Sequence, residues 1–152
     1  MARTLKDLAK SMRQKADAVE SSASRLSVIG TKAAVELLVY ITPVDTSEHL
    51  SNWQVFIGNP APDALPPYFL GTKGSTRGAS AREAIDQALS ELGYKKPGQR
   101  LFISNLGPAI VKLDQGWSSQ FPGGFVPRAL VAFRVAVQEA IARGAVFNER
   151  VT

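Results

Sequence analysis

The longest pattern in the sequence is an amphipathic stripe that runs through the first 41 residues. Apolar residues recur there mostly at steps of three and four, with charged residues between them, which is the spacing of one face of an α-helix. The pattern predicts a helix from about Thr4 to about Ile41, and Thr42-Pro43 ends it because proline lacks the amide that the helix would use. The apolar positions are Leu5, Leu8, Met12, Ala16, Val19, Ala23, Leu26, Ala33 and Leu37.

The length of this helix constrains the rest of the fold. A continuous helix over these positions would span about 55 Å at the standard rise per residue, which exceeds the diameter of a compact domain of 152 residues. The helix therefore either breaks or projects. Serine and glycine in its middle favour a break, so we expect two helices in line or one kinked helix. Core packing explains the stripe most simply, and the alternative is that its first half packs on a neighbouring subunit. The candidate break positions are Ser21, Ser22, Ser24, Ser27 and Gly30.

Shorter patterns predict the elements of the remaining chain. Asp45, Thr46 and Ser47 are good N-cap residues, so a short helical turn that carries Leu50 and Trp53 is expected after them. Strands are expected at 54–57 and 101–105, a second strand or a helical turn at 109–113, and helices at 80–92 and 127–142. A loop rich in proline and glycine spans 61–78, with Lys73 and Arg77 at its tip.

This order of elements predicts one α+β domain over residues 1–152. Its long helical segment, residues 1–41, is expected to project or kink, and residues 42–152 form the α+β body. The body should hold a small, mainly antiparallel sheet packed against the long helix, the middle helix and the C-terminal helix.

A glycine-rich loop with large aromatic residues follows the second predicted strand. Between Asp114 and Pro127 it carries Trp117, Phe121 and Phe125 among several glycines. Large aromatic side chains are costly to leave in water, so we expect this loop to lie on its own domain or on another chain.

Few residues offer catalytic or metal chemistry. The chain has no cysteine, which excludes a disulfide framework, a thiolate nucleophile and a cysteine-based zinc site. A Ser-His-Asp triad around His49 is conceivable, but an exposed or cap-adjacent histidine in a polar turn is the better interpretation. No acidic pair has a metal-ligand spacing. The segments 30–32 and 71–75 lack the earlier glycine of a phosphate loop. We therefore expect no enzyme, no cofactor and no metal.

Net charge and hydropathy limit the kinds of partner that we expect for this protein. The 18 basic and 13 acidic residues give a net charge of +5, which favours contact with polyanions but falls short of a dedicated nucleic-acid binder. No apolar run approaches the roughly 18 residues that a membrane span needs, and the charged N-terminus has no targeting signal. We expect an intracellular-type protein with no membrane partner.

Three segments together resemble a known family. They are TPVDTSEHLSNWQV, GTKGSTRGASAREAI and LFISNLGPAIVKLDQGWSSQFPGGFV, in that order. They are similar to the head-to-tail joining and tail completion (neck) proteins of the HK97 gp10-like group of bacteriophages. Two positions depart from the pattern: Ser47 stands where many relatives have glycine, and residues 107–109 stand where they usually have a proline-tyrosine pair. The matching residues are Pro43, Val44, Asp45, Thr46 and Trp53, then Asn105, Asp114, Gly116, Trp117, Ser118, Gln120, Pro122 and Gly124.

The resemblance implies a structural virion protein without catalytic turnover. Such proteins form a homo-oligomeric ring, commonly a hexamer, at the neck between head and tail after assembly in the host cytoplasm. The ring joins the portal or connector (adaptor) proteins to the tail terminator or tail tube protein, and genomic DNA passes through it. The resemblance places a subunit or partner interface at Asp114, Gly116, Trp117, Ser118, Gln120, Phe121, Pro122, Gly124 and Phe125. Pro43, Asp45, Thr46, Trp53 and Asn105 would lock a turn.

Elementary symmetry is consistent with a ring. A ring needs two different, complementary surfaces on each subunit, and the projecting helix and the aromatic loop are candidates. Lys73 and Arg77 could line the channel and attract phosphates nonspecifically. The alternative function is a basic nucleic-acid-binding or regulatory module. Single-strand binders interleave basic and stacking residues, whereas the aromatic loop has only Lys112 and Arg128 nearby.

Overall fold

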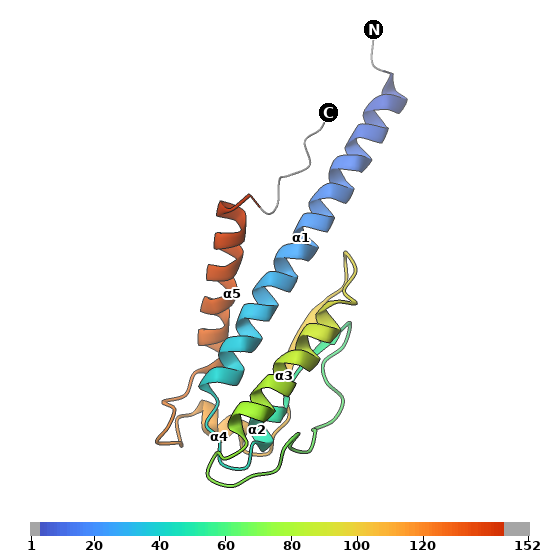
Figure 1. The fold of residues 1–152 in the computed structure, drawn as a ribbon. Coiled ribbons are helices and arrows are strands. Elements are labelled where there is room, and N and C mark those ends of the chain that lie inside the picture. The colour runs from blue at the N-terminus through green and yellow to red at the C-terminus, as the bar shows by residue number, and fades with distance from the viewer. Residues whose placement is uncertain (1–3, 145–152) are drawn as a thin grey trace.

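The computed structural model describes residues 4–144, which form an α+β domain, as the sequence predicts. A long N-terminal helix, a middle helix, a C-terminal helix and a two-stranded antiparallel sheet pack together (Figure 1). The elements are α1 (Leu5–Ile41), α2 (Glu48–Ser51), β1 (Trp53–Ile57), α3 (Arg77–Leu92), β2 (Leu101–Asn105), α4 (Ile110–Asp114) and α5 (Phe125–Ala142).

Helix α1 is unbroken over its 37 residues, so the predicted break is wrong. The serines do not interrupt it because their hydroxyls can bond within the helix, as the Ser27 hydroxyl does by donating to the Ser24 carbonyl at 2.7 Å. Gly30 stands where Phe133 of α5 packs against α1. A Cβ at Gly30 would lie 2.5 Å from ring atoms of Phe133. Packing against α5 therefore explains this glycine.

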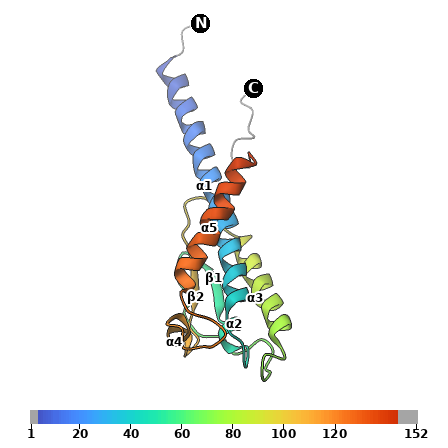
Figure 2. The same ribbon diagram turned by 90° about the vertical axis from the view of Figure 1, so that its left-hand side faces the viewer.

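The N-terminal half of α1 projects beyond the other elements (Figures 1 and 2). A capping box closes its first turn: the Thr4 amide donates to the Asp7 carboxylate at 3.0 Å, and the Asp7 amide donates to the Thr4 hydroxyl at 3.2 Å. The apolar side chains of this half are exposed, with Leu5 at 87%, Met12 at 63% and Val19 at 69%. The sequence predicts that a helix this long either breaks or projects, and the structure shows that it projects (Figure 1).

The core lies where the C-terminal half of α1 meets the sheet, α3 and α5. Strands β1 and β2 pair from Trp53 opposite Asn105 to Ile57 opposite Leu101. Strand β1 packs on α3 and α1, and α5 packs along α1. The buried apolar residues are Val35, Leu38, Val39, Val44, Leu50, Trp53, Val55, Ala84, Ala88, Leu92, Phe121 and Phe125.

Of the two alternatives predicted for residues 109–113, the structure has the helical turn, which is the short helix α4. The starts of two longer helices differ from the prediction. Helix α3 begins at Arg77, three residues before the predicted start at Ser80. Helix α5 begins at Phe125, so Pro127 is its third residue. Proline is tolerated there because the first amides of a helix have no partner within the helix.

Candidate interaction site

The aromatic loop, residues 114–124, is closed at its base by Asp114. This residue ends α4, and its carboxylate accepts a hydrogen bond from the Phe125 amide at 2.6 Å. Its carbonyl accepts a second one from the Gly124 amide at 2.9 Å. Since Gly124 has no side chain with which to cap α5, the Asp114 carboxylate supplies the negative charge that a helix N-terminus favours.

Two glycines let the backbone of this loop pass close to itself. Gly116 and Gly123 have φ angles of +82° and +94°, which L side chains rarely adopt. A Cβ at Gly116 would lie 2.7 Å from the Pro122 carbonyl oxygen, and a Cβ at Gly123 would collide with the Asp114 carbonyl oxygen. The loop is therefore a tightly closed structure rather than a loose linker.

The three aromatic residues of this region separate into two environments. Phe121 and Phe125 are 4% and 2% exposed, and their rings stack at 4.5 Å. Trp53 meets the Phe125 ring edge-on at 5.4 Å. These two phenylalanines thus lie on their own domain, as core residues rather than the interface residues that the sequence suggested. Trp117 is 72% exposed, and the Lys112 ammonium lies 5.4 Å from the centre of its ring.

The predicted turn-lock residues Trp53 and Asn105, at the start of β1 and the end of β2, each hydrogen-bond to another element. The Trp53 indole donates to the Thr42 hydroxyl at 2.7 Å, and this hydroxyl donates to the Leu38 carbonyl at 2.6 Å. The Asn105 side chain donates to the His49 carbonyl at 2.7 Å. Half-buried Pro43 follows Thr42 directly. These bonds fix the end of α1 to the start of β1, and helix α2 to the end of β2.

Of the three residues predicted as N-cap candidates, Ser47 occupies the N-cap position of α2, whereas the cap prediction is wrong for Asp45 and Thr46. The backbone of Ser47 is left-handed at φ 67°, and its side chain makes no capping hydrogen bond. The Asp45 carboxylate instead accepts from the Lys73 amide at 2.7 Å. Ser47 and Thr76 share a hydroxyl hydrogen bond at 2.9 Å, while Thr46 is exposed. The left-handed turn therefore ties the chain to the turn around Lys73 instead of starting the helix with a cap.

Lys73 and Arg77 do not form the basic loop tip that the sequence predicts. Arg77 is the first residue of α3, and its guanidinium donates to the Tyr40 carbonyl in the last turn of α1 at 2.5 Å. The last carbonyls of a helix need such partners. Lys73 is exposed. Of the two proposed DNA contacts, only Lys73 keeps its charged group free of a contact within the domain.

Buried polar residues that the sequence did not single out hold the proline-rich loop before α3. The Asn52 amide group donates to the Leu65 carbonyl at 2.7 Å and accepts from the Leu65 amide at 2.8 Å. The Ser51 hydroxyl accepts from the Tyr68 amide at 3.0 Å. No sequence signal marks Ser51 and Asn52, because small polar residues in a short turn are usually exposed.

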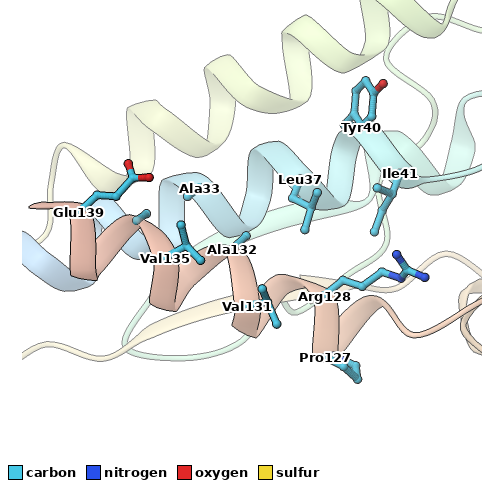
Figure 3. Close-up of a pocket in the computed structure, with 11 residues that line it drawn as sticks. Ala33, Leu37, Tyr40, Ile41, Pro127, Arg128, Val131, Ala132, Val135 and Glu139 are labelled. Carbon is cyan, nitrogen blue, oxygen red and sulfur yellow. The ribbon is translucent and has the colours of Figure 1, made fainter.

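An apolar groove of about 830 Å³ lies between α1 and α5 (Figure 3). Three residues that line the groove are exposed: Tyr40 at 76%, Val131 at 60% and Val135 at 47%. Among the described residues, the charged groups that line it are Arg128 and Glu139, toward its two ends. The sequence analysis missed this groove, although apolar residues on more than one side of α5 are a signal for it. Its lining is Ala33, Leu37, Tyr40, Ile41, Pro127, Arg128, Val131, Ala132, Val135, Ala136 and Glu139.

The surroundings of His49 do not form a catalytic triad. Its Nδ1 atom is buried and has no hydrogen-bond partner. The Ser47 hydroxyl is shared with Thr76, and the Ser51 hydroxyl donates to the Ser47 carbonyl at 2.9 Å. Burial lowers the pKa of His49 below its ordinary value, and the charge of Glu48 opposes that shift. Within residues 4–144, no three histidine, aspartate or glutamate side chains are grouped so that they could hold a metal ion.

None of the described helices combines the length and the apolarity that crossing a membrane requires. Compared with known proteins, the chain matches no family model, no curated protein and no solved structure.

Proposed function

We propose that the protein is a structural virion protein that forms a ring at the neck of a bacteriophage and joins the portal or connector to the tail. One support is that the residues behind the family resemblance gather around one end of the molecule. The end of α1, helices α2 and α4 and the loops between them lie together there (Figure 1). At this end, hydrogen bonds join Asp45 to the turn at Lys73, Asn105 to α2, and Asp114 to the start of α5.

The observation that carries the proposal is the exposure of Trp117. Its loop is closed by Asp114 and by two glycines that admit no side chain, yet the indole is 72% exposed. A large apolar ring in water is costly, and tryptophan is enriched among the residues that dominate protein–protein affinity. A rigid loop that presents such a ring is suited to bind a protein partner.

The alternative, a nucleic-acid-binding module, has less support. Arg77 contacts α1 instead of extending from a loop. Trp117 has Lys112 beside it, but a single-strand binder needs a groove in which several basic and stacking groups alternate. In a ring, by contrast, Lys73 would recur around the channel in every subunit and attract passing DNA without reading its sequence.

Electron microscopy of the purified protein tests the proposal directly. We expect closed rings with a central opening, and we expect labelled antibodies against the protein to mark the neck of intact virions. In a DNA titration, the wild-type protein should show no sequence-specific binding at physiological salt. A protein that forms no rings and binds one DNA sequence tightly at that salt concentration would overturn the proposal and favour the alternative.

A further inference from the structure

The face of α1 that packs on α5 continues beyond the end of α5. Apolar, small or aromatic residues occupy each position of a repeat with alternating steps of four and three from Leu5 to Tyr40. A sustained seven-residue repeat is typical of a helix that pairs with other helices along its whole length. The repeat consists of Leu5, Ala9, Met12, Ala16, Val19, Ala23, Leu26, Gly30, Ala33, Leu37 and Tyr40.

Helix α5 covers this face only around Gly30 and borders it toward the C-terminus of α1. Phe133 of α5 lies against Gly30, and Ala33 and Leu37 line the groove beside α5. The N-terminal part, which we call the projecting stripe, is exposed at every position. It consists of Leu5, Ala9, Met12, Ala16 and Val19.

The described part of the chain cannot cover the projecting stripe by folding back. Helix α1 is unbroken, so Met12 lies about 40 Å along its axis from the end of the groove at Tyr40. Helix α5 runs beside α1 only as far as Ala142, and the stripe extends past it (Figure 1). A helix face that keeps its apolar repeat without a partner among residues 4–144 is suited to a partner in another chain.

The α1/α5 groove and the projecting stripe have similar lengths. Its α5 wall, from Pro127 to Glu139, is about 18 Å long, and the stripe from Leu5 to Val19 is about 21 Å long at the standard helical rise. Alanines at positions 33, 132 and 136 line the groove. Small residues of this kind let the larger leucine, methionine and valine side chains of another helix interdigitate.

The charges beside the stripe and the groove indicate one orientation. Arg128 lies toward one end of the groove and Glu139 toward the other (Figure 3). If the docked helix runs antiparallel to α5, its basic N-terminal part lies near Glu139 and its acidic part near Arg128. Asp7, in the basic part, is bound in the capping box of Thr4. The basic residues are Lys6, Lys10, Arg13 and Lys15, and the acidic ones are Asp17 and Glu20.

We propose that the projecting stripe of one copy docks in the α1/α5 groove of a second copy, antiparallel to α5. This inference rests on the proposed ring and specifies its subunit contact. Stripe and groove are different surfaces of the same chain, so the contact repeats from copy to copy and can close a ring. Pairing of two stripes would leave the groove open and would stop at a dimer.

Cross-linking tests the contact, because the chain has no cysteine of its own. Chains that carry Met12→Cys are mixed with chains that carry Val135→Cys and treated with a short bis-maleimide. We expect cross-linked dimers in the mixture, few with either variant alone, and a ladder of multimers when one chain carries both substitutions. Lys10→Cys, on the same helix but off the stripe, replaces Met12→Cys in the control and should cross-link poorly. Efficient cross-linking of Met12→Cys to itself would indicate stripe-to-stripe pairing and overturn the inference.

A matched pair of charge substitutions tests whether the stripe holds the oligomer together. Met12→Glu should weaken assembly about tenfold or more, as measured by light scattering, while circular dichroism stays unchanged. Gln14→Glu adds the same charge off the stripe and should assemble normally. Rings in the electron microscope without Met12–Val135 cross-links would overturn this contact and leave the proposed function standing. A wild-type protein that stays monomeric would overturn both.

Discussion

The adjacent residues 123 and 124 are both glycines, but for different structural reasons. Gly123 and Gly124 both have positive φ angles, +94° and +82°. A Cβ at Gly123 would collide with the Asp114 carbonyl, whereas a Cβ at Gly124 would meet nothing within 4 Å. The first glycine is required by the close passage of the backbone, and the second only by its left-handed conformation.

Alanine substitutions should separate these two requirements. Gly124→Ala should cost about 1 to 2 kcal/mol of unfolding free energy, the penalty of a left-handed alanine. Gly123→Ala should cost about 1 to 2 kcal/mol more, because it also displaces the Asp114 cap from α5. Urea denaturation of both variants measures the difference. Equal losses would mean that the loop can open without disturbing α5.

His49 should make folding stability depend on pH. Burial lowers the pKa of His49 in the folded state below its ordinary value of 6.5, although Glu48 opposes the shift. The unfolded state therefore takes up a proton at higher pH than the folded state does. The contribution of His49 to stability is fully present above about pH 6.5 and is lost as the pH falls from there toward the folded pKa. Melting temperatures between neutral and mildly acidic pH measure this loss. The control His49→Gln should melt with a flatter pH profile, and an equally steep one would assign the effect to other groups.

At the scale of elements, two helical glycines have opposite surroundings. Gly30 in α1 faces the Phe133 ring, where a Cβ would come within 2.5 Å, whereas Gly78 in α3 faces open space. Alanine is the better helix former of the two residue types, so the surroundings decide the sign of each substitution.

Gly78→Ala should stabilise the protein by up to about 1 kcal/mol, because only the helix propensity changes. Gly30→Ala should destabilise it by about 1 to 3 kcal/mol, because the new methyl group forces α5 away from α1. Thermal unfolding measures both. In a Phe133→Ala background the loss from Gly30→Ala should shrink, which is the coupling expected for residues in contact. If both alanines stabilised the protein, the approach of α5 to α1 would be looser than described here.

Features of the fold that depend on residues close together in the sequence were easier to predict than those that depend on distant residues. The strand at 101–105 and the end of α1 are predicted correctly because an apolar run and a proline act within a few residues. The prediction of a break at Gly30 is wrong because the contact that explains this glycine, the Phe133 ring, lies far along the chain. Asp45 is a cap by residue type, yet the left-handed backbone of Ser47 gave its carboxylate a different partner.

The candidate site was harder to predict for the same reason. The residues of the aromatic loop stand out by their type, but Trp117 and Phe121 do not differ in any local signal that sets their burial. In the loop closed by Asp114, the Phe121 ring stacks on Phe125 in the core and the Trp117 ring is exposed. That closure is a tertiary contact between α4 and α5.

At the scale of the whole molecule, α1 connects the two surfaces on which the proposed assembly depends. Its C-terminus is fixed to the sheet through Thr42 and Trp53, at the end of the molecule where the aromatic loop lies (Figure 2). Its other end carries the projecting stripe. Since the helix between them is unbroken, the stripe and the aromatic loop are held apart at a fixed separation. A subunit of this shape can bind the next subunit of the ring through the projecting stripe. At the same time it can bind a portal or tail protein through the aromatic loop.

Trp117 is the residue at which folding and assembly can be separated. Because the indole is 72% exposed, Trp117→Ala should leave the unfolding free energy within about 0.5 kcal/mol of the wild type, as for other surface substitutions. It should also leave ring formation intact, since the proposed subunit contact lies on α1 and α5. Joining of heads to tails should fail, because the partner loses a large apolar anchor. In-vitro complementation of particles that lack this protein, scored as infectious units, measures joining.

The matched control is Phe121→Ala, which truncates a buried ring in the same loop. Phe121 is 4% exposed and stacks on Phe125, so this variant should lose about 3 to 5 kcal/mol of stability and fail in joining because it folds poorly. A Trp117→Ala protein that complements as well as the wild type would remove the indole from the proposed interface. A Trp117→Ala protein that unfolds like Phe121→Ala would place the indole in the core. If Trp117 is an exposed anchor on a closed loop, Trp117→Ala should stop the joining of heads to tails without changing the melting temperature of the protein.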